Sequence, residues 1–407
     1  MTDGTMLRVA LGDTVVGHLR RRDGVSWFDF DRGYLDDPRR PVLGLSFEEN
    51  VDLAVRGGAR LPAWFSNLLP EGVVRTWIAS DLGVASDREF DLLGRVGLDL
   101  PGAVVVTVVD ADDRVLPTVF SRSVEETGSE SAQLWRFSLA GVAPKFSMLG
   151  AGDKFTAPVH GEVGDWIVKL PDPVFADLPA NEHAMMTLAA AAGIEVPEVR
   201  LIHRDWLDGL PEYAWRSTED FAYAIRRFDR PSGGSRRHIE DLAQVLNRYP
   251  DDKYQGNFET VAGLLFRGYD VASLREFARR LAFFVLIGNG DAHVKNWSVI
   301  YDEPRAPRIS PAYDIVATEV YRPGGRDEAL GLKFNGTRRF NQIRLSDFER
   351  LERKLDAVGS GLLDVVREVV ERTHAGWPEV RGNALLRREH ADVITANLEV
   401  RASQLSR

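Results

Sequence analysis

The feature that most constrains the fold of this chain is an apolar run that stops abruptly at a polar loop. Residues 281–287 read LAFFVLI, and the tripeptide Gly-Asn-Gly at 288–290 follows them directly. A run of this kind passes through the interior of a protein, and neither a helix nor a strand continues easily through two glycines and an asparagine. We therefore expect a buried element that ends by holding the polar loop after it in a fixed place.

The polar loop carries oxygen-bearing side chains at a spacing that suits phosphoryl transfer. It runs from Asp291 to Asn296 (DAHVKN), a short strand-like piece follows at 297–301, and a further aspartate, Asp314, comes after it. Protein kinases arrange a D-x-x-x-x-N pattern and a second aspartate in this way around a nucleoside triphosphate. Asp291 suits the removal of a proton from an acceptor hydroxyl, whereas Asn296 and Asp314 offer the oxygen ligands that magnesium prefers. Taken alone, the short pattern also suits a polar turn between two buried strands.

Length and composition describe an ordinary globular protein and exclude several kinds of site. The chain has 407 residues, enough for two or three domains, of which 44% are hydrophobic and 28% charged. It has no cysteine, which excludes disulfides, thiolate metal sites and cysteine nucleophiles and fits a cytoplasmic protein. The N-terminus lacks a charged segment followed by an apolar stretch, and no window approaches the roughly 20 apolar residues of a membrane span.

The net charge of the chain limits the classes of molecule that it is expected to bind. The net charge of -10 and the pI near 5.4 argue against attraction of the whole surface to nucleic acid, although a local basic patch could touch a phosphate backbone. Only seven of the 51 basic residues are lysines. Since arginine serves as the general surface cation of this sequence, each lysine position is a candidate for a particular role.

The first part of the chain is predicted to form one α+β unit. Residues 7–31 alternate in the manner of strands in a small antiparallel sheet. From Leu61 apolar residues recur at helical spacing, and a helix and then a strand follow up to about residue 110. The polar, serine-containing segment at 111–131 is interpreted as a linker.

Two lysines after the linker lie where a nucleotide phosphate would account for them. Small residues around Gly141 let backbone N–H groups approach a phosphate, and Lys145 adds a cation, although a plain β-hairpin turn explains this segment as well. Lys169 sits on an apolar strand, where burial is costly without an anionic partner; the alternative is an edge strand whose lysine reaches solvent. The helix expected at 181–193 carries Glu182, which either pairs with Lys169 or favours the helix N-terminus.

The remaining segments predict a hinge and a larger helical lobe. Residues 223–230 form a strand that leaves the small lobe, a natural place to hold adenine through backbone groups. Helical segments at 239–246, 257–265 and 273–287 would stand behind the catalytic loop, and residues 345–405 contain further amphipathic helices.

In this order the parts resemble the HipA family of bacterial serine/threonine kinases, the toxin halves of HipBA-type toxin–antitoxin pairs. The resemblance covers nearly the whole chain. The segments that carry it are FSNLLPEG (65–72), SLAGVAPK (138–145), WIVKLPDP (166–173), Asn181-Glu182, IEVP (194–197), RFDR (227–230), HIEDLAQVL (238–246) with Lys253-Tyr254, GNGDAHVKN (288–296) and Tyr313-Asp314.

The resemblance implies an α+β fold, in which a small N-terminal α/β domain precedes a two-lobed domain related to protein and phosphoinositide kinases. It divides the chain into an N-terminal subdomain at 1–110, a linker at 111–131, a kinase N-lobe with phosphate loop and hinge at 132–230, and a helical C-lobe with the catalytic loop at 231–407.

The resemblance also assigns roles to individual residues. It makes Asp291 the catalytic base and gives Mg²⁺ to Asn296 and Asp314, while Lys169 would meet the ATP phosphates. Ser138 matches a loop serine that family members phosphorylate themselves, although this serine could simply support the turn. The remaining nucleotide contacts would come from the loop residues Ala140, Gly141, Val142, Ala143, Pro144 and Lys145, from the hinge residues Arg226, Arg227 and Phe228, and from His293, Val294, Lys295 and Tyr313.

The implied activity is Mg-ATP-dependent phosphorylation of a protein by a growth-arresting toxin. Its substrate would be a translation-related protein such as an aminoacyl-tRNA synthetase. Its partner would be a HipB-like helix-turn-helix antitoxin, through which alone it would reach DNA, and no membrane is involved. Two rival functions stay open, a small-molecule phosphotransferase and a catalytically weak scaffold for a DNA-bound regulator. A basic cluster could approach DNA in such an assembly, although a solvated face or a substrate contact explains it as well; it consists of Arg226, Arg227, Arg230, Arg236 and Arg237.

Overall fold

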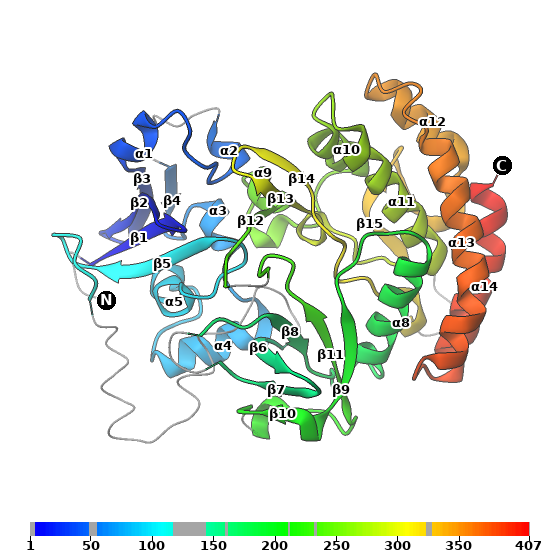
Figure 1. Cartoon of the computed structure of the whole chain (residues 1–407), viewed down its shortest axis with the longest axis horizontal. Helices are drawn as coiled ribbons and strands as arrows, with labels where there is room; N and C mark the ends of the chain where they lie inside the picture. Colours follow the sequence, from blue (N-terminus) through cyan, green and yellow to red (C-terminus); the bar gives the residue numbers. More distant parts are fainter. Residues whose placement is uncertain are drawn as a thin grey trace.

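The described residues form three groups of secondary structure: an N-terminal sheet, a second sheet, and a helical part that also contains two small sheets (Figure 1). The structure is a computed structural model, and it describes residues 5–48, 55–116, 144–158, 162–210, 212–231, 234–322 and 328–406. In Figure 1 the N-terminal sheet and the long C-terminal helices lie at opposite ends of the molecule, and the second sheet lies between them. The mixture of helices and sheets agrees with the expected α+β fold.

The N-terminal group is an antiparallel sheet with short helices. Its strands run in the order β4-β3-β2-β1-β5, which confirms the sheet expected at 7–31. We call residues 5–116 the N-terminal unit. Its strands are β1 (Met6–Leu11), β2 (Thr14–Arg22), β3 (Val25–Phe30), β4 (Val55–Gly58) and β5 (Val104–Val109), and its helices are α1 (Arg32–Asp36), α2 (Leu45–Glu48), α3 (Ala63–Ser66), α4 (Gly72–Asp81) and α5 (Glu89–Val96).

The second sheet has Lys169 in its interior. Its strand order is β10-β7-β6-β8-β11-β9, so β8, which ends at Lys169, lies between two other strands. Lys145 and Tyr223 stand directly opposite Lys169 on those neighbours, and the edge-strand alternative is therefore wrong. The elements of this group are β6 (Lys145–Ala151), β7 (Lys154–Thr156), β8 (Trp166–Lys169), α8 (Leu178–Ala191), β9 (Val199–His203), β10 (Leu207–Asp208) and β11 (Phe221–Arg226).

The helical part matches the sequence expectation except at its start. Residues 239–241, expected to be helical, belong to a strand, because they pair with β13 across a three-stranded sheet. Only the end of that segment is helical, and the Asp241 side chain caps it by accepting from the N–H of Gln244. The elements are β12 (His238–Asp241), α9 (Leu242–Val245), α10 (Phe258–Phe266), α11 (Val271–Ile287), β13 (Ser298–Glu303), β14 (Ala306–Ile309), β15 (Ala329–Phe334), β16 (Thr337–Arg339), α12 (Leu345–Lys354), α13 (Leu362–Asn383) and α14 (Arg388–Leu405).

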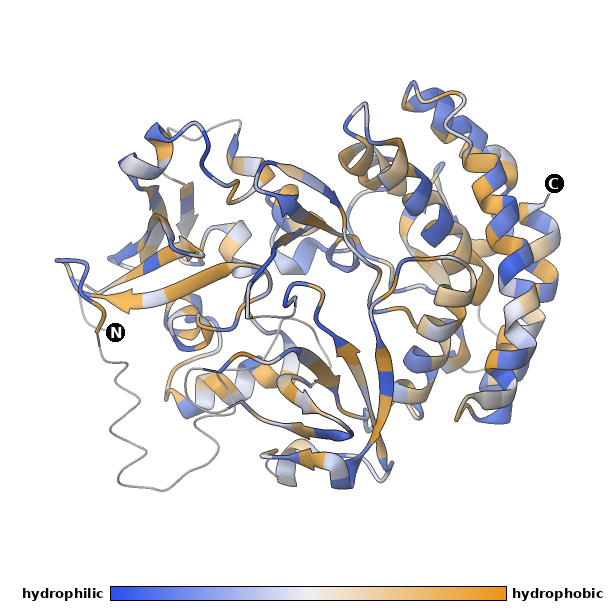
Figure 2. Ribbon diagram, in the orientation of Figure 1, coloured by the Kyte–Doolittle hydropathy of each residue, from blue (hydrophilic) through white to orange (hydrophobic). Residues whose placement is uncertain are grey.

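Two buried apolar clusters join these groups across their boundaries. One cluster combines the N-terminal unit with one face of the second sheet, for example Phe65 with Trp166 and Val168. The other combines α8 and part of β11 with the helical part, in which α11 is buried along most of its length. Figure 2 shows the corresponding hydrophobic residues along β5, β11 and the long helices. The second sheet thus packs against the N-terminal unit on one side and against the helical part on the other, which fixes the positions of the three groups relative to one another.

Part of the expected basic cluster is buried. Arg227 and Arg230 follow β11, and their guanidinium groups donate to Asp99, to Asp229 and to the carbonyl oxygen of Leu100. Both arginines are nearly inaccessible to solvent. The expectation that these two could approach DNA is therefore wrong: their charges are neutralised by Asp99 and Asp229 where the N-terminal unit meets the second sheet.

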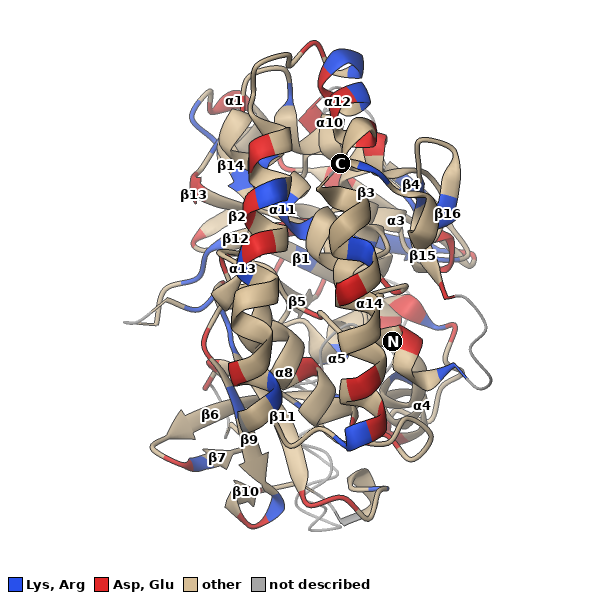
Figure 3. Cartoon of the chain, turned by 90° about the vertical axis from the view of Figure 1, so that its right-hand side faces the viewer, with Lys and Arg blue, Asp and Glu red and all other residues tan. Residues whose placement is uncertain are grey.

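Charges on the outer helices are mixed in sign. Figure 3 shows Lys and Arg interspersed with Asp and Glu along α13 and α14, with neither sign gathered into one stripe. Pairs such as Arg372–Glu368 and Arg381–Asp392 account for part of this pattern. Among the helices that the structure describes, none combines the length and the apolar character that crossing a bilayer requires.

Candidate active site

The apolar run ends at the polar loop in the expected way. It forms the last two turns of α11, and Gly288 ends the helix with a positive φ of 74° and donates its N–H to the carbonyl oxygen of Phe284. A glycine is needed here, because a Cβ atom would lie 2.4 Å from the Glu319 carboxylate as well as meeting a left-handed backbone. The buried Asn289 then accepts a hydrogen bond from the N–H of Asp291 at 3.0 Å. The loop therefore leaves the helix in one fixed direction.

Asp291 and Asn296 are held by the loop itself. Residues 294–296 form a 3₁₀ turn, and the Asn296 side-chain amide donates to the carbonyl oxygen of Asp291 at 2.8 Å. The Asp291 carboxylate is about half-exposed, at 48%, and accepts a hydrogen bond from the hydroxyl of Tyr254. Burial raises the pKa of Asp291, and the Tyr254 hydrogen bond partly opposes this. The carboxylate is thus accessible and more basic than an ordinary aspartate.

Lys169 joins two carboxylates from different elements. Its Nζ lies 2.6 Å from Oε1 of Glu182 on α8 and 2.5 Å from Oδ1 of Asp314. Burial alone would lower the pKa of Lys169, but the two carboxylates raise it, so the side chain stays charged. Burial raises the pKa of Glu182 to about 7 against the effect of Lys169, whereas Lys169 and Lys145 lower the pKa of Asp314 below its usual range against the opposing effect of its partial burial. Of the two outcomes considered for Glu182, the structure shows the ion pair.

The backbone at Asp314 is itself unusual. This residue has a positive φ of 60°, a conformation that costs a non-glycine residue free energy and that aspartate tolerates better than most. The geometry turns the carboxylate toward Lys169 and leaves it 31% exposed. Such strain is concentrated at functional sites, where the surrounding structure holds it in place.

Lys145 adds a second cation beside Lys169. The two residues are cross-strand neighbours on β6 and β8, and burial lowers the pKa of Lys145 while Asp314 opposes that effect. The positive charge of the nearby Lys169 also lowers the pKa of Lys145. Two cations side by side in a buried position favour an anionic ligand.

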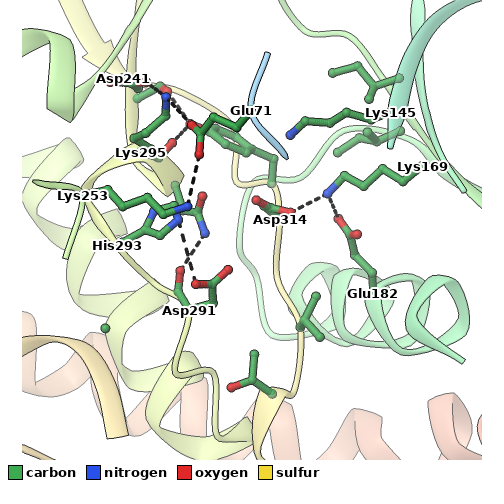
Figure 4. A pocket seen from close by; sticks show the side chains of 18 of the residues that line it. Glu71, Lys145, Lys169, Glu182, Asp241, Lys253, Asp291, His293, Lys295 and Asp314 are labelled. Carbon is green, nitrogen blue, oxygen red and sulfur yellow. Dashed lines mark hydrogen bonds and ion pairs between the residues drawn. The ribbon is translucent and has the colours of Figure 1, made fainter. Parts of the chain in front are cut away.

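These side chains converge on one cavity of about 760 Å³ between the N-terminal unit, the second sheet and the helical part. Figure 4 shows Lys145, Lys169 and Glu182 on one side and Asp291, His293, Lys253 and Lys295 on the other, with Asp314 between them. The sequence-predicted residues that line the cavity are Lys145, Lys169, Arg226, Arg227, Phe228, Asp291, His293, Lys295, Asn296, Tyr313 and Asp314.

Comparisons with models of known families identify the family to which the chain belongs. A family model described as HipA N-terminal domain matches residues 7–107, and one described as HipA-like C-terminal domain matches residues 137–377. The chain belongs to the HipA family. The sequence resemblance is thereby confirmed, and so is the fold class that it implied.

Relatives of this HipA-family chain bear kinase names. A protein of Sinorhizobium fredii named "Putative kinase Y4dM" is 39% identical over 399 residues, which cover 96% of this chain and 95% of the relative. The "Serine/threonine-protein kinase toxin HipA" of Shewanella oneidensis is 27% identical over 374 residues, covering 80% of this chain and 78% of the relative. HipA in the Shewanella oneidensis complex of HipA, HipB and operator DNA has the same fold, with a TM-score of 0.73 at 21% identity over 98% of this chain and 96% of that one. The family is thus one of toxin kinases.

Several predicted residues of this HipA-family chain have other surroundings than expected. The Val294 side chain is buried in the apolar cluster of the helical part and does not line the cavity. The Arg227 guanidinium is turned into the buried pairs with Asp99 and Asp229, so that only its backbone remains for a hinge contact. Pro144 precedes β6, and its carbonyl oxygen accepts from the N–H of Leu170. Ser138, Ala140, Gly141, Val142 and Ala143 lie outside the described residues, as does most of the predicted linker.

Sequence reasoning gave no site role to three residues that the cavity contains. Glu71, from the N-terminal unit, lies 2.8 Å from Nζ of Lys295 and 3.4 Å from Nζ of Lys253. Tyr254 bonds to Asp291 and packs edge-on against the His293 ring at 5.0 Å. The scarcity of lysine did single out Lys253, but no local signal links Glu71 to a loop so distant in the sequence.

The residues present fit a magnesium ion held together with a nucleotide. Among the described residues, no three carboxylate or imidazole groups converge to hold a metal by themselves. Magnesium in nucleotide sites needs only one or two protein oxygens, because phosphates and water supply the others. Asn296 and Asp314, which both line the cavity, offer oxygens of this kind. His293 is neutral, since burial and Lys253 lower its pKa to about 3, and so it adds no charge against the ion.

Proposed function

We propose that this chain is a serine/threonine protein kinase that uses Mg-ATP and acts as the growth-arresting toxin of a toxin–antitoxin pair. The observation that carries the proposal is the contact of Lys169 with both Glu182 and Asp314 in the cavity that also contains Asp291. This lysine–glutamate pair and the metal-binding aspartate are the two parts that a kinase must have in place for phosphoryl transfer.

Each residue then has a defined task. Asp291 accepts the proton of the acceptor hydroxyl, for which its raised pKa and its accessible carboxylate are suited. Glu182 holds Lys169 in position, and Lys169 with the neighbouring Lys145 would supply positive charge to the phosphates of bound ATP. Asp314 and Asn296 supply oxygens for Mg²⁺, which when bound neutralises phosphate charge. Tyr254, which now donates to Asp291, has to yield this position to the acceptor hydroxyl.

The acceptor is proposed to be a protein, such as an aminoacyl-tRNA synthetase, whose phosphorylation would stop translation in the cytoplasm. We further propose that the chain phosphorylates its own Ser138. A phosphate adds roughly two negative charges at neutral pH, and beside a loop that binds anions these charges would repel the nucleotide. Support for both assignments comes from the family resemblance and not from the described residues.

The partner is proposed to be a HipB-like helix-turn-helix antitoxin that links the kinase to operator DNA. The support is the shared fold with HipA of the Shewanella oneidensis complex, which contains HipB and operator DNA. The acidic balance of this chain, with a net charge of -10, fits a contact with DNA through the antitoxin alone.

The test is phosphate incorporation from radiolabelled Mg-ATP by the purified chain, beside Asp291→Gln and Ser138→Ala. We expect labelling of the unsubstituted chain at Ser138, located by mass spectrometry, and none in Asp291→Gln. Ser138→Ala should bind ATP and phosphorylate an added protein acceptor without labelling itself. Stoichiometric labelling of Ser138→Ala would refute the self-phosphorylation site, and ATP binding without any transfer to protein would refute the kinase assignment in favour of a small-molecule phosphotransferase or a scaffold.

A further inference from the structure

The N-terminal unit inserts a carboxylate between two lysines of the site. Glu71 immediately precedes α4, and it is the one acidic residue that this unit contributes to the described lining of the cavity. Its Oε1 lies 2.8 Å from Nζ of Lys295, which belongs to the catalytic loop, and its Oε2 lies 3.4 Å from Nζ of Lys253. Figure 4 shows the carboxylate reaching in between these two ammonium groups, with Asp291 and His293 beyond them. One side chain thus bridges two cations.

The two lysines depend on Glu71 for their neutralisation. The Lys295 side chain is only 7% exposed, and its other carboxylate neighbour, Asp241, lies 3.9 Å away. Burial raises the pKa of Asp241 to about 6, so this group holds its charge less firmly than an ordinary aspartate. Burial also acts to raise the pKa of Glu71, but Lys295 and Lys253 outweigh it and keep the carboxylate ionised. Without Glu71 the two lysines would repel each other with little compensation.

The segment that carries Glu71 is anchored against the helical part. The Asn67 side-chain amide donates to the carbonyl oxygen of Arg248 at 2.7 Å, and its Oδ1 accepts from Lys295 at 3.1 Å. The Trp64 indole donates to the buried Glu240 at 2.8 Å. A carboxylate held on such a rigid base can fix the position of the loop that it touches.

We propose that Glu71 is a positioning residue of the kinase site, through which the N-terminal unit completes the catalytic loop. This inference rests on the proposed kinase function. Glu71 keeps Lys295, and with it the adjoining Asn296, in the geometry needed for transfer. It also holds Lys253 away from Asp291, whose pKa Lys253 already lowers from its present position. Once released, Lys253 would pair with Asp291 and make it a poorer base.

The direct test compares phosphoryl-transfer rates of the full-length chain and its Glu71→Gln variant, which keeps the shape of the side chain and removes its charge. A displacement of about 1 Å can cost about 100-fold in rate, and we expect a loss of kcat of about 10- to 100-fold. The KM for ATP should change by less than about threefold, because Lys169, which is proposed to meet the phosphates, is paired with Glu182 and Asp314 and not with Glu71. The double variant Glu71→Gln/Lys253→Gln should lose less than the product of the two single losses, since one variant removes the cation that the other releases.

Two further variants separate positioning from simple docking of the N-terminal unit. Asp251→Asn removes another ion pair between the same parts, Arg60–Asp251 at 2.7 Å, which is exposed and lies away from the described lining of the cavity. We expect it to keep the full rate. Glu71→Asp keeps the charge and withdraws it by one methylene, and its loss of kcat should fall between those of the unsubstituted chain and Glu71→Gln. If Glu71→Gln does not remain folded, Glu71→Asp alone carries the test.

The transfer rates of these variants distinguish failure of the inference about Glu71 from failure of the proposed kinase function. A rate for Glu71→Gln or Glu71→Asp equal to that of the unsubstituted chain would overturn the inference and leave the kinase function intact. An equal loss in Asp251→Asn would reduce Glu71 to a docking contact and overturn it as well. No transfer by the unsubstituted chain, despite ATP binding, would overturn the proposed function and this inference together.

Discussion

Replacing Arg227 by methionine should destabilise the fold strongly, whereas the same change at the adjacent Arg226 should not. The Arg227 side chain is 1% exposed and donates to Asp99 at 2.7 Å and to Asp229 at 2.9 Å and 3.0 Å. The Arg226 side chain is 39% exposed and has one ion pair, with Asp165 at 3.5 Å. Two residues adjacent in the sequence thus provide a matched pair that differs in burial.

The expected loss of stability follows from the charges that Arg227→Met leaves without a partner. Asp99 and Asp229 would face each other in a buried site with Arg230 as their remaining cation, and this second arginine is held less firmly, since burial and Arg227 itself lower its pKa to about 10. Removing one partner of a buried ion pair costs about 3–5 kcal/mol, because the other charge stays buried without compensation. An exposed ion pair such as Arg226–Asp165 contributes about 0–1 kcal/mol.

The assay is urea unfolding followed by tryptophan fluorescence. With a slope of about 3 kcal/mol per molar urea, a loss of 3–5 kcal/mol lowers the midpoint by about 1–1.7 M, against less than about 0.3 M for Arg226→Met. Equal shifts for the two variants would refute the argument from burial. Loss of operator binding in the presence of antitoxin, without any loss of stability, would instead favour the DNA contact that the structure excludes for Arg227.

Three further predictions concern the site. Lys169→Met removes the cation proposed for the phosphates and leaves Glu182 and Asp314 without their shared partner, so the free energy of ATP binding should weaken by about 2 kcal/mol or more in calorimetry. Lys154→Met, at an exposed position of β7, should bind ATP as before. Equal affinities of the two variants for ATP would contradict the role of Lys169. The rate should fall as the pH drops through the raised pKa of Asp291. Because the Tyr254 hydrogen bond lowers that pKa in the free protein, Tyr254→Phe should move the acidic limb of the pH profile of kcat/KM to higher pH, and a shift to lower pH would show the sign to be wrong. Saturating Mg-ATP at about 100 times its Kd should stabilise the chain by about 2.7 kcal/mol, measured as a rise in Tm, and EDTA should remove most of this rise; an equal rise with metal-free ATP would argue against a metal held by Asn296 and Asp314.

The sequence alone determined the features that depend on neighbours along the chain. The end of α11 could be predicted because an apolar run followed by Gly-Asn-Gly leaves a helix no way to continue, and Gly288 indeed takes the left-handed conformation that ends it. The spacing of Asp291 and Asn296 could be read in the same way, because a separation of five positions keeps both side chains in one loop. The family resemblance depended on such local segments taken together.

Only the tertiary structure decided what depends on distant partners. Ile239 lies in a strand because its hydrogen bonds go to β13, and no local pattern reports that pairing. Lys169 is interior because β6 and β11 flank its strand, and Arg227 is buried because Asp99 and Asp229 compensate its charge. Glu71 reaches Lys295 only when the N-terminal unit packs against the catalytic loop. The sequence does not distinguish a charged residue on the surface from one in a buried ion pair. The partner that compensates a buried charge is brought to it by packing between segments far apart in the sequence.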